Sequence, residues 1–146
     1  MFLEPHELKS ASIPEIINNA VNNNEDVVRT IIQESIQEMR SYLSERFDVD
    51  AIFEPIPEAT TEEPEPKDKR NKVIIKHLKK IVIFEIYQRR GDAMTESVEK
   101  GYNEALNWLE KVASGKIPAG DLPYKPEDAE DIFIKFGGNT KFNSNW

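Results

Sequence analysis

The feature that most limits the fold of this chain is a long series of apolar residues spaced three or four positions apart. The series runs from Val27 to Phe47, and polar residues such as Arg29 and Arg40 lie between its members. This spacing is typical of an α-helix with one apolar face, here about 20 residues and about 30 Å long. Such a helix needs neighbours to cover that face. The apolar members are Val27, Val28, Ile31, Ile32, Ile36, Met39, Leu43 and Phe47.

The segment from Asn71 to Arg90 shows the same helical spacing, but its apolar residues are spread around more than one side. A helix that is apolar on several sides is covered by more than one neighbour. Its second face is therefore predicted to meet either the rest of the bundle or another subunit. The run Ile81–Phe84 is also compatible with a strand, yet the helical spacing continues on both sides of it and favours a helix.

A third long helix is predicted to begin after Thr95, whose hydroxyl suits a helix N-cap, and to end near Gly115, which suits a left-handed stop. Pro5 and Pro14 indicate two short helices before the first long one, because proline is favoured at the first helical position. The predicted fold is all-α: a small antiparallel helical bundle of three long helices plus short N-terminal helices, with a long acidic loop and an extended C-terminal arm.

Residues 1–116 are predicted to form the bundle domain, including an acidic, proline-rich loop at 54–70, and residues 117–146 to form the extended docking arm. The 146-residue chain contains no cysteine, which excludes disulfides, thiolate metal sites and thiol catalysis. This fits a reducing cytoplasm or a particle assembled there. No apolar run approaches about 18 residues, and the N-terminus has no signal pattern, so neither a membrane span nor secretion is expected.

Two oppositely charged segments follow one another in the middle of the chain. Residues 54–66 hold four prolines, five glutamates and no basic residue, which predicts a solvated loop or an acidic surface at a subunit junction or channel. Residues 67–90 hold nine basic and two acidic residues, a local charge of +7. This segment is predicted to be a solvated face, to pair with the acidic segment of a neighbouring copy, or to contact phosphate. The candidates for a subunit interface are Val73, Ile83, Phe84, Tyr87, Lys76, Lys80, Glu62 and Glu63.

The last fifteen residues carry four aromatic side chains on a stretch too short and too rich in Gly and Asn to fold alone. A soluble monomer seldom leaves so much apolar surface on a terminus. This end of the chain is therefore predicted to be an anchoring arm that docks on another polypeptide. The docking candidates are Phe133, Phe136, Lys141, Phe142 and Trp146.

No enzyme site is indicated by the sequence. Glu34 and Glu38 are four residues apart, like the paired carboxylates that hold magnesium in helical nucleotide hydrolases, but both lie off the apolar stripe. His6 and His77 belong to no metal-ligand pattern, and no Gly-rich phosphate loop occurs. We therefore predict no catalytic residues, no metal site and no cofactor. Magnesium-dependent turnover would be needed to support the hydrolase alternative.

Four short motifs are spread over nearly the whole chain. The first is the opening Phe2-Leu3 with Glu7-Leu8-Lys9, and the second is Ser41-Tyr42-Leu43 with Arg46-Phe47-Asp48-Val49. The third is Tyr102-x-x-Ala105-x-x-Trp108-Leu109-x-x-Val112-Ala113-x-Gly115-Lys116, and the last is Gly138-Asn139-x-Lys141-Phe142. In this order the motifs resemble those of the Mu-like head-completion or head–tail connector adaptors of tailed phages, and the shared order is more specific than any one motif.

The resemblance implies a virion structural protein at the head–tail junction, assembled in the host cytoplasm. Such adaptors form a ring, commonly of twelve copies, between the portal and a stopper or tail-completion protein. The C-terminal arm clasps the portal, with Phe142 as a docking residue. DNA passes through the channel that the ring lines, without sequence-specific binding, and no membrane is involved. The alternative is a nucleic-acid-binding helical protein that uses the basic segment Lys67–Lys80.

Overall fold

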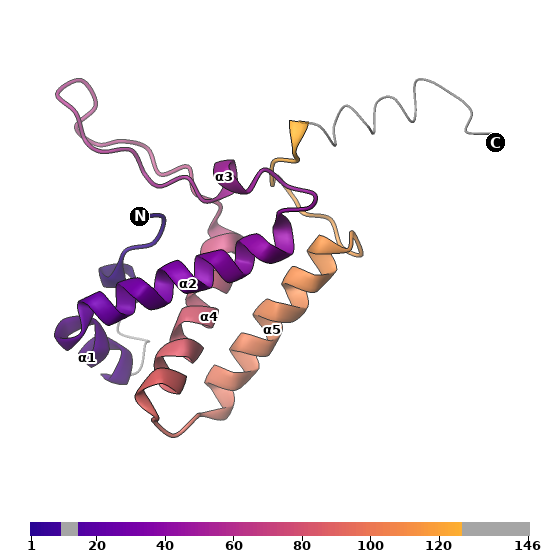
Figure 1. Cartoon of the computed structure of the whole chain (residues 1–146). Helices are drawn as coiled ribbons and strands as arrows, with labels where there is room; N and C mark the ends of the chain where they lie inside the picture. Colours follow the sequence, from indigo (N-terminus) through magenta and orange to yellow (C-terminus); the bar gives the residue numbers. More distant parts are fainter. Residues whose placement is uncertain (10–14, 127–146) are drawn as a thin grey trace.

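A computed structural model describes residues 1–9 and 15–126 of the chain, and it is all-α in these ranges (Figure 1). The only β-type pairing among them is an isolated bridge between Phe47 and Tyr124. The elements are a 3-10 helix η1 (Pro5–Leu8) and the α-helices α1 (Glu15–Asn23), α2 (Glu25–Leu43), α3 (Val49–Ile52), α4 (Lys72–Arg90) and α5 (Glu96–Ala113). The predicted all-α bundle with three long helices and short N-terminal ones is confirmed.

The three long helices run alternately up and down. Arg89 at the end of α4 lies beside Val27 at the start of α2 and pairs with Glu34, so these two helices are antiparallel. A short connection then turns the chain back, and α5 lies along α4 as a hairpin (Figure 1). Helix α4 contacts both α2 and α5. This central position explains why its apolar residues spread around the helix. The run Ile81–Phe84 lies within α4, so the prediction of a helix there, rather than a strand, is confirmed.

The helix ends follow the local chemistry of the sequence. The Asn71 side chain accepts hydrogen bonds from the backbone N–H groups of Val73 and Ile74, and the Thr95 hydroxyl accepts one from Val98. Both are N-caps that satisfy amides left without a helical partner. Gly115 follows α5 with φ +77°, the left-handed conformation predicted for it.

The core is a single apolar cluster shared by the helices and by the N-terminal segment. Most of the predicted stripe of α2 is buried, as are Leu3 before η1 and Leu8 at the end of η1. Two residues differ from the sequence expectation. Val27, expected in the core, is 44% exposed because it lies at the edge of α2, and Tyr87, expected on an outer face, is buried between the helices.

Residues 54–66 form an extended arm that projects from the body between α3 and α4 (Figure 1). We call it the acidic arm. At its tip the chain turns back, with the amide of Thr60 donating to the carbonyl of Glu63 at 2.9 Å. All five of its glutamates are exposed. An extended, solvated conformation is expected for a segment that proline keeps out of helices and that like charges stretch.

After α5 the chain packs back on the bundle as far as Pro126. Leu122 is buried in the core, and Tyr124 stacks on Phe47 with the ring centres 5.0 Å apart. The carbonyl of Pro123 accepts a hydrogen bond from the amide of Asp48 at 2.9 Å. These contacts hold residues 122–124 against the bundle.

Candidate interaction surfaces

The root of the acidic arm is fixed by one arginine. The Arg70 side chain is 7% exposed and lies 2.7 Å from a carboxylate oxygen of Glu7 and 3.0 Å from one of Asp68. It also donates to the carbonyl of Phe2 at 2.7 Å. Burial alone would raise the pKa of Glu7, but its hydrogen bonds with Arg70 and the Glu4 amide hold it below the usual value. The arm therefore leaves the body at a defined place.

The basic segment 67–90 is less positive at the surface than its composition implies. Five of its nine cations form ion pairs within the described chain. Four of their acidic partners come from outside the segment, so they offset part of the +7. These pairs are Arg70–Glu7, Lys80–Glu104, Arg89–Glu34 and Arg90–Asp92, with Lys72 and Arg70 both on Asp68. The cations without an ion pair in residues 1–9 and 15–126 are Lys67, Lys69, Lys76 and Lys79.

The predicted apolar interface residues on α4 lie in different environments. Val73 is 46% exposed near the start of the helix, and Ile83 is half-buried against the core. Phe84 is half-buried and stacks on Tyr102 of α5, with the ring centres 3.8 Å apart. Tyr87 is buried in the chain's own core and has almost no surface to offer a partner. The predicted second apolar face is thus largely covered by α5.

Of the predicted charged interface residues, some are exposed and one is paired within the chain. Lys76 is exposed, whereas Lys80 packs along Gly101 and pairs with Glu104 at 3.0 Å. Glu62 and Glu63 lie exposed at the tip of the acidic arm. The predicted docking residues Phe133, Phe136, Lys141, Phe142 and Trp146 lie outside the described residues.

The residues considered for chemistry do not converge on a site. Glu34 is paired with Arg89, while burial and the neighbouring Glu85 carboxylate raise the pKa of Glu38. No group of three or more potential metal-ligating His, Asp or Glu side chains occurs in residues 1–9 and 15–126. Over the same ranges, no helix has the length and apolar character that a membrane crossing requires.

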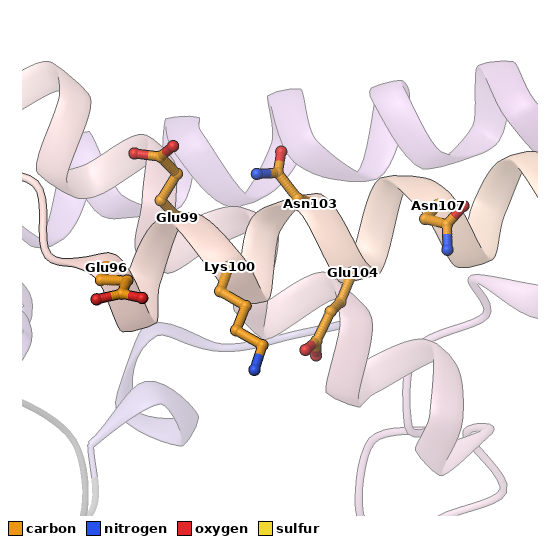
Figure 2. A pocket seen from close by; sticks show the side chains of 6 residues that line it. All are labelled: Glu96, Glu99, Lys100, Asn103, Glu104 and Asn107. Carbon is orange, nitrogen blue, oxygen red and sulfur yellow. The ribbon is translucent and has the colours of Figure 1, made fainter.

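The outer face of α5 is a polar strip (Figure 2). The side chains spread along the helix and point in different directions, so they do not converge on one point. Glu104 is the only one of them with an ion pair to another element of the described chain, through Lys80 of α4. This arrangement is a solvated helix face. Its residues are Glu96, Glu99, Lys100, Asn103, Glu104 and Asn107.

Little in the residue pattern indicates that a histidine is buried. His77 stacks on Trp108 of α5 with the ring centres 4.4 Å apart and the planes 19° apart. Its Nδ1 is buried without a hydrogen-bond partner among the described residues. Burial, with the charges of Lys80 and Lys76, lowers the pKa of His77 to about 4. The neutral ring thus serves as part of the core, although it stands between lysines in the sequence.

The described residues form a small all-α bundle with an acidic arm held at its base by Arg70. Most cations of the basic segment 67–90 are ion-paired within the described chain. The family model described as Bacteriophage Mu, Gp36 matches residues 5–131, and the chain belongs to this family. It is therefore a bacteriophage protein of the Mu-like type, a virion or morphogenesis protein. No curated protein and no solved structure matches the chain.

Proposed function

We propose that this chain is a head–tail connector adaptor, a virion structural protein that forms a ring between the portal and a tail-completion or stopper protein. Membership of the bacteriophage Mu Gp36 family is the observation that carries the proposal. The role is structural, without catalysis and without a cofactor. Its place is the head–tail junction of the virion, after assembly in the host cytoplasm.

The charge distribution supports assembly into a ring. Each copy carries an exposed acidic arm and cations on other surfaces, so it presents both members of a complementary pair. Contacts between two different surfaces join copies head to tail, and such contacts close into a ring when the rotation between copies allows. The proposed number is twelve copies. Each copy has a net charge of −8, so a channel lined by the ring would bind passing DNA weakly.

The aromatic C-terminal arm is proposed to anchor this ring on the portal. Burying four aromatic side chains contributes several kcal/mol per copy, before the cost of ordering the arm is subtracted. A ring multiplies this anchoring because each arm binds at high local concentration once its neighbours are seated. The proposed anchors are Phe133, Phe136, Lys141, Phe142 and Trp146.

Deleting residues 137–146 is expected to leave a folded bundle that no longer joins capsids to tails. The measurement is the yield of infectious particles when the shortened chain replaces the full one, with folding checked by circular dichroism. Phe142→Ala with Trp146→Ala should reproduce the loss, whereas the matched control Asn143→Ala with Asn145→Ala should not. Full infectivity with the shortened chain would refute the anchoring role.

The second candidate function is nucleic-acid binding through Lys67–Lys80. It is favoured by the four lysines without an ion pair in the described chain, and weakened by the pairing of the other cations in this region. Retention of the isolated monomer on DNA, falling steeply with added salt, would support it. Ring formation without such retention would support the adaptor.

A further inference from the structure

A groove with an apolar floor and a cationic rim lies where α1, α2 and α4 meet. It encloses about 210 Å³. Val27, which is 44% exposed, stands at its edge, although its neighbour Val28 is buried. An apolar side chain left open beside an apolar hollow gains by being covered. The lining residues are Ala20, Asn24, Val27, Val28, Ile31, Ile86, Arg89 and Arg90.

The two arginines at the rim keep donors available for a ligand. Arg89 uses Nη2 to reach Glu34 at 2.8 Å, and Arg90 uses Nε to reach Asp92 at 2.9 Å. Both pairs are exposed, so each contributes little and is readily shared with another acid. A guanidinium has five N–H donors, which leaves several on each arginine to bind further carboxylates. The groove therefore fits an apolar side chain flanked by acidic ones.

The first part of the acidic arm has this chemistry. Its sequence is Glu54-Pro55-Ile56-Pro57-Glu58, and all five residues are exposed. No glutamate of the arm forms an ion pair within the described chain. The two prolines keep the segment extended before binding, which lowers the entropy lost when it docks. Ile56 is the one large apolar side chain that the arm exposes.

Within one copy, no residue of the segment lines the groove. The arm begins just after α3, which Arg40 ties to the last part of α2 through Asp50 at 2.6 Å. Val27 lies in the first turn of α2. Arg40 lies 13 residues after Val27 in the same helix, about 20 Å away at about 1.5 Å per residue. The groove of a second copy is therefore the natural partner of the segment.

We propose that Ile56 of one copy inserts into the groove of the next copy, with Glu54 and Glu58 binding Arg89 and Arg90. The occupant of the groove is thus the acidic arm of a second copy of this chain. Because arm and groove are different surfaces, the contact runs head to tail and leaves one of each available at the ends. This inference rests on the proposed function to the extent that the chain assembles with itself.

A chain without cysteine allows a direct crosslinking test. Full-length Ile56→Cys and Val27→Cys proteins are mixed and oxidised, and the products are identified by mass spectrometry. A disulfide between the two different variants is expected. Val73→Cys is the matched control, because Val73 is 46% exposed on another part of the surface. Equal crosslinking to Val27→Cys and Val73→Cys, or none to Val27→Cys, would overturn the inference.

Binding of the isolated segment provides a second, independent readout. A peptide of residues 54–60 is titrated into full-length Ile56→Asp protein, whose own arm cannot compete, and NMR shifts are followed at Val27, Ile31 and Ile86. Arg89→Glu with Arg90→Glu should weaken peptide binding at least about tenfold, since two attractive contacts become repulsive. A peptide with lysine at positions 54 and 58 should bind this reversed groove. If neither charge reversal changed the affinity of the peptide for the protein, the inference would be contradicted.

These results separate the inference from the proposed function. Peptide binding and crosslinking without any role in joining capsids to tails would leave the groove contact standing and remove the adaptor role. Infectious particles formed with the Ile56→Asp chain, or with the Arg89→Glu, Arg90→Glu chain, would remove the groove contact and leave the adaptor role standing. If deletion of residues 127–146 were needed before the peptide could bind, the chain's own C-terminal segment would be the occupant, and the inference would be wrong.

Discussion

His77 shows how a single titratable side chain becomes part of an apolar core. It lies flat on Trp108 and faces Lys76, Lys80 and Glu104, while its Nδ1 has no partner among the described residues. Protonation would place a charge in a desolvated position next to two lysines. The folded protein therefore keeps the ring neutral, with a pKa of about 4 compared with 6.5 for an ordinary histidine.

This difference in pKa predicts a pH dependence of stability. The unfolded chain takes up a proton at His77 as pH falls below 6.5, whereas the folded chain does so only near 4. The stabilisation is therefore complete above 6.5 and is lost as pH falls toward 4, by up to about 3 kcal/mol. Urea unfolding between pH 6.5 and 4 should show the free energy of unfolding falling with pH in the natural chain, and falling less steeply in His77→Phe. Equal slopes would contradict the assignment.

Arg70 is the second residue whose environment decides its effect. Its side chain is 7% exposed and holds Glu7, Asp68 and the Phe2 carbonyl together, whereas Lys72 binds the same Asp68 with a side chain that is 70% exposed. Arg70→Met is expected to lower the free energy of unfolding by about 2–4 kcal/mol, because it leaves a partly buried carboxylate without its partner. Lys72→Met should cost less than about 1 kcal/mol. Similar losses in urea unfolding would contradict the different burial of the two sites.

At the scale of elements, the sequence patterns predict the helices well because local chemistry determines where they begin and end. Asn71, Thr95 and Gly115 act at the helix ends as their residue types indicate. The faces are predicted less well. Val27 belongs to the apolar series of its helix and Tyr87 to the outer face of its own, yet the packing of the helices exposes Val27 and buries Tyr87. The groove beside Val27 could not be predicted, since it is made by three separate elements.

Gly115 provides a test of one helix end. A Cβ at this position would lie 2.7 Å from Nη1 of Arg46, which donates to the Val112 carbonyl. Gly115→Ala should lower the free energy of unfolding by about 1–2 kcal/mol through both the left-handed backbone and the displaced arginine. Gly91→Ala is the matched control, because Gly91 has φ +70° but nothing within 4 Å. It should cost about 1 kcal/mol. Thermal unfolding of both variants measures the difference, and a smaller loss for Gly115→Ala would contradict the proposed role of Arg46.

At the scale of the whole molecule, the bundle carries an acidic arm held at its base by Arg70 and a groove where α1, α2 and α4 meet. The arm's glutamates form no ion pair within the described chain, Val27 at the groove is 44% exposed, and the two surfaces are complementary in charge and in apolar character. An interaction between copies was one of three predictions from the charge runs, beside a solvated face and contact with phosphate. Lys80 is paired with Glu104, and Lys76 does not line the groove. Arg89 and Arg90 are the proposed contacts because they stand at the rim of the apolar groove.

We propose that copies of this phage protein form a ring between head and tail. Electron microscopy of the neck of virions from the phage that encodes it tests this most directly. We predict a closed ring of copies of this chain beneath the portal, with the C-terminal arms reaching the portal. Reconstructed necks in which no density fits the bundle of α2, α4 and α5 would contradict it.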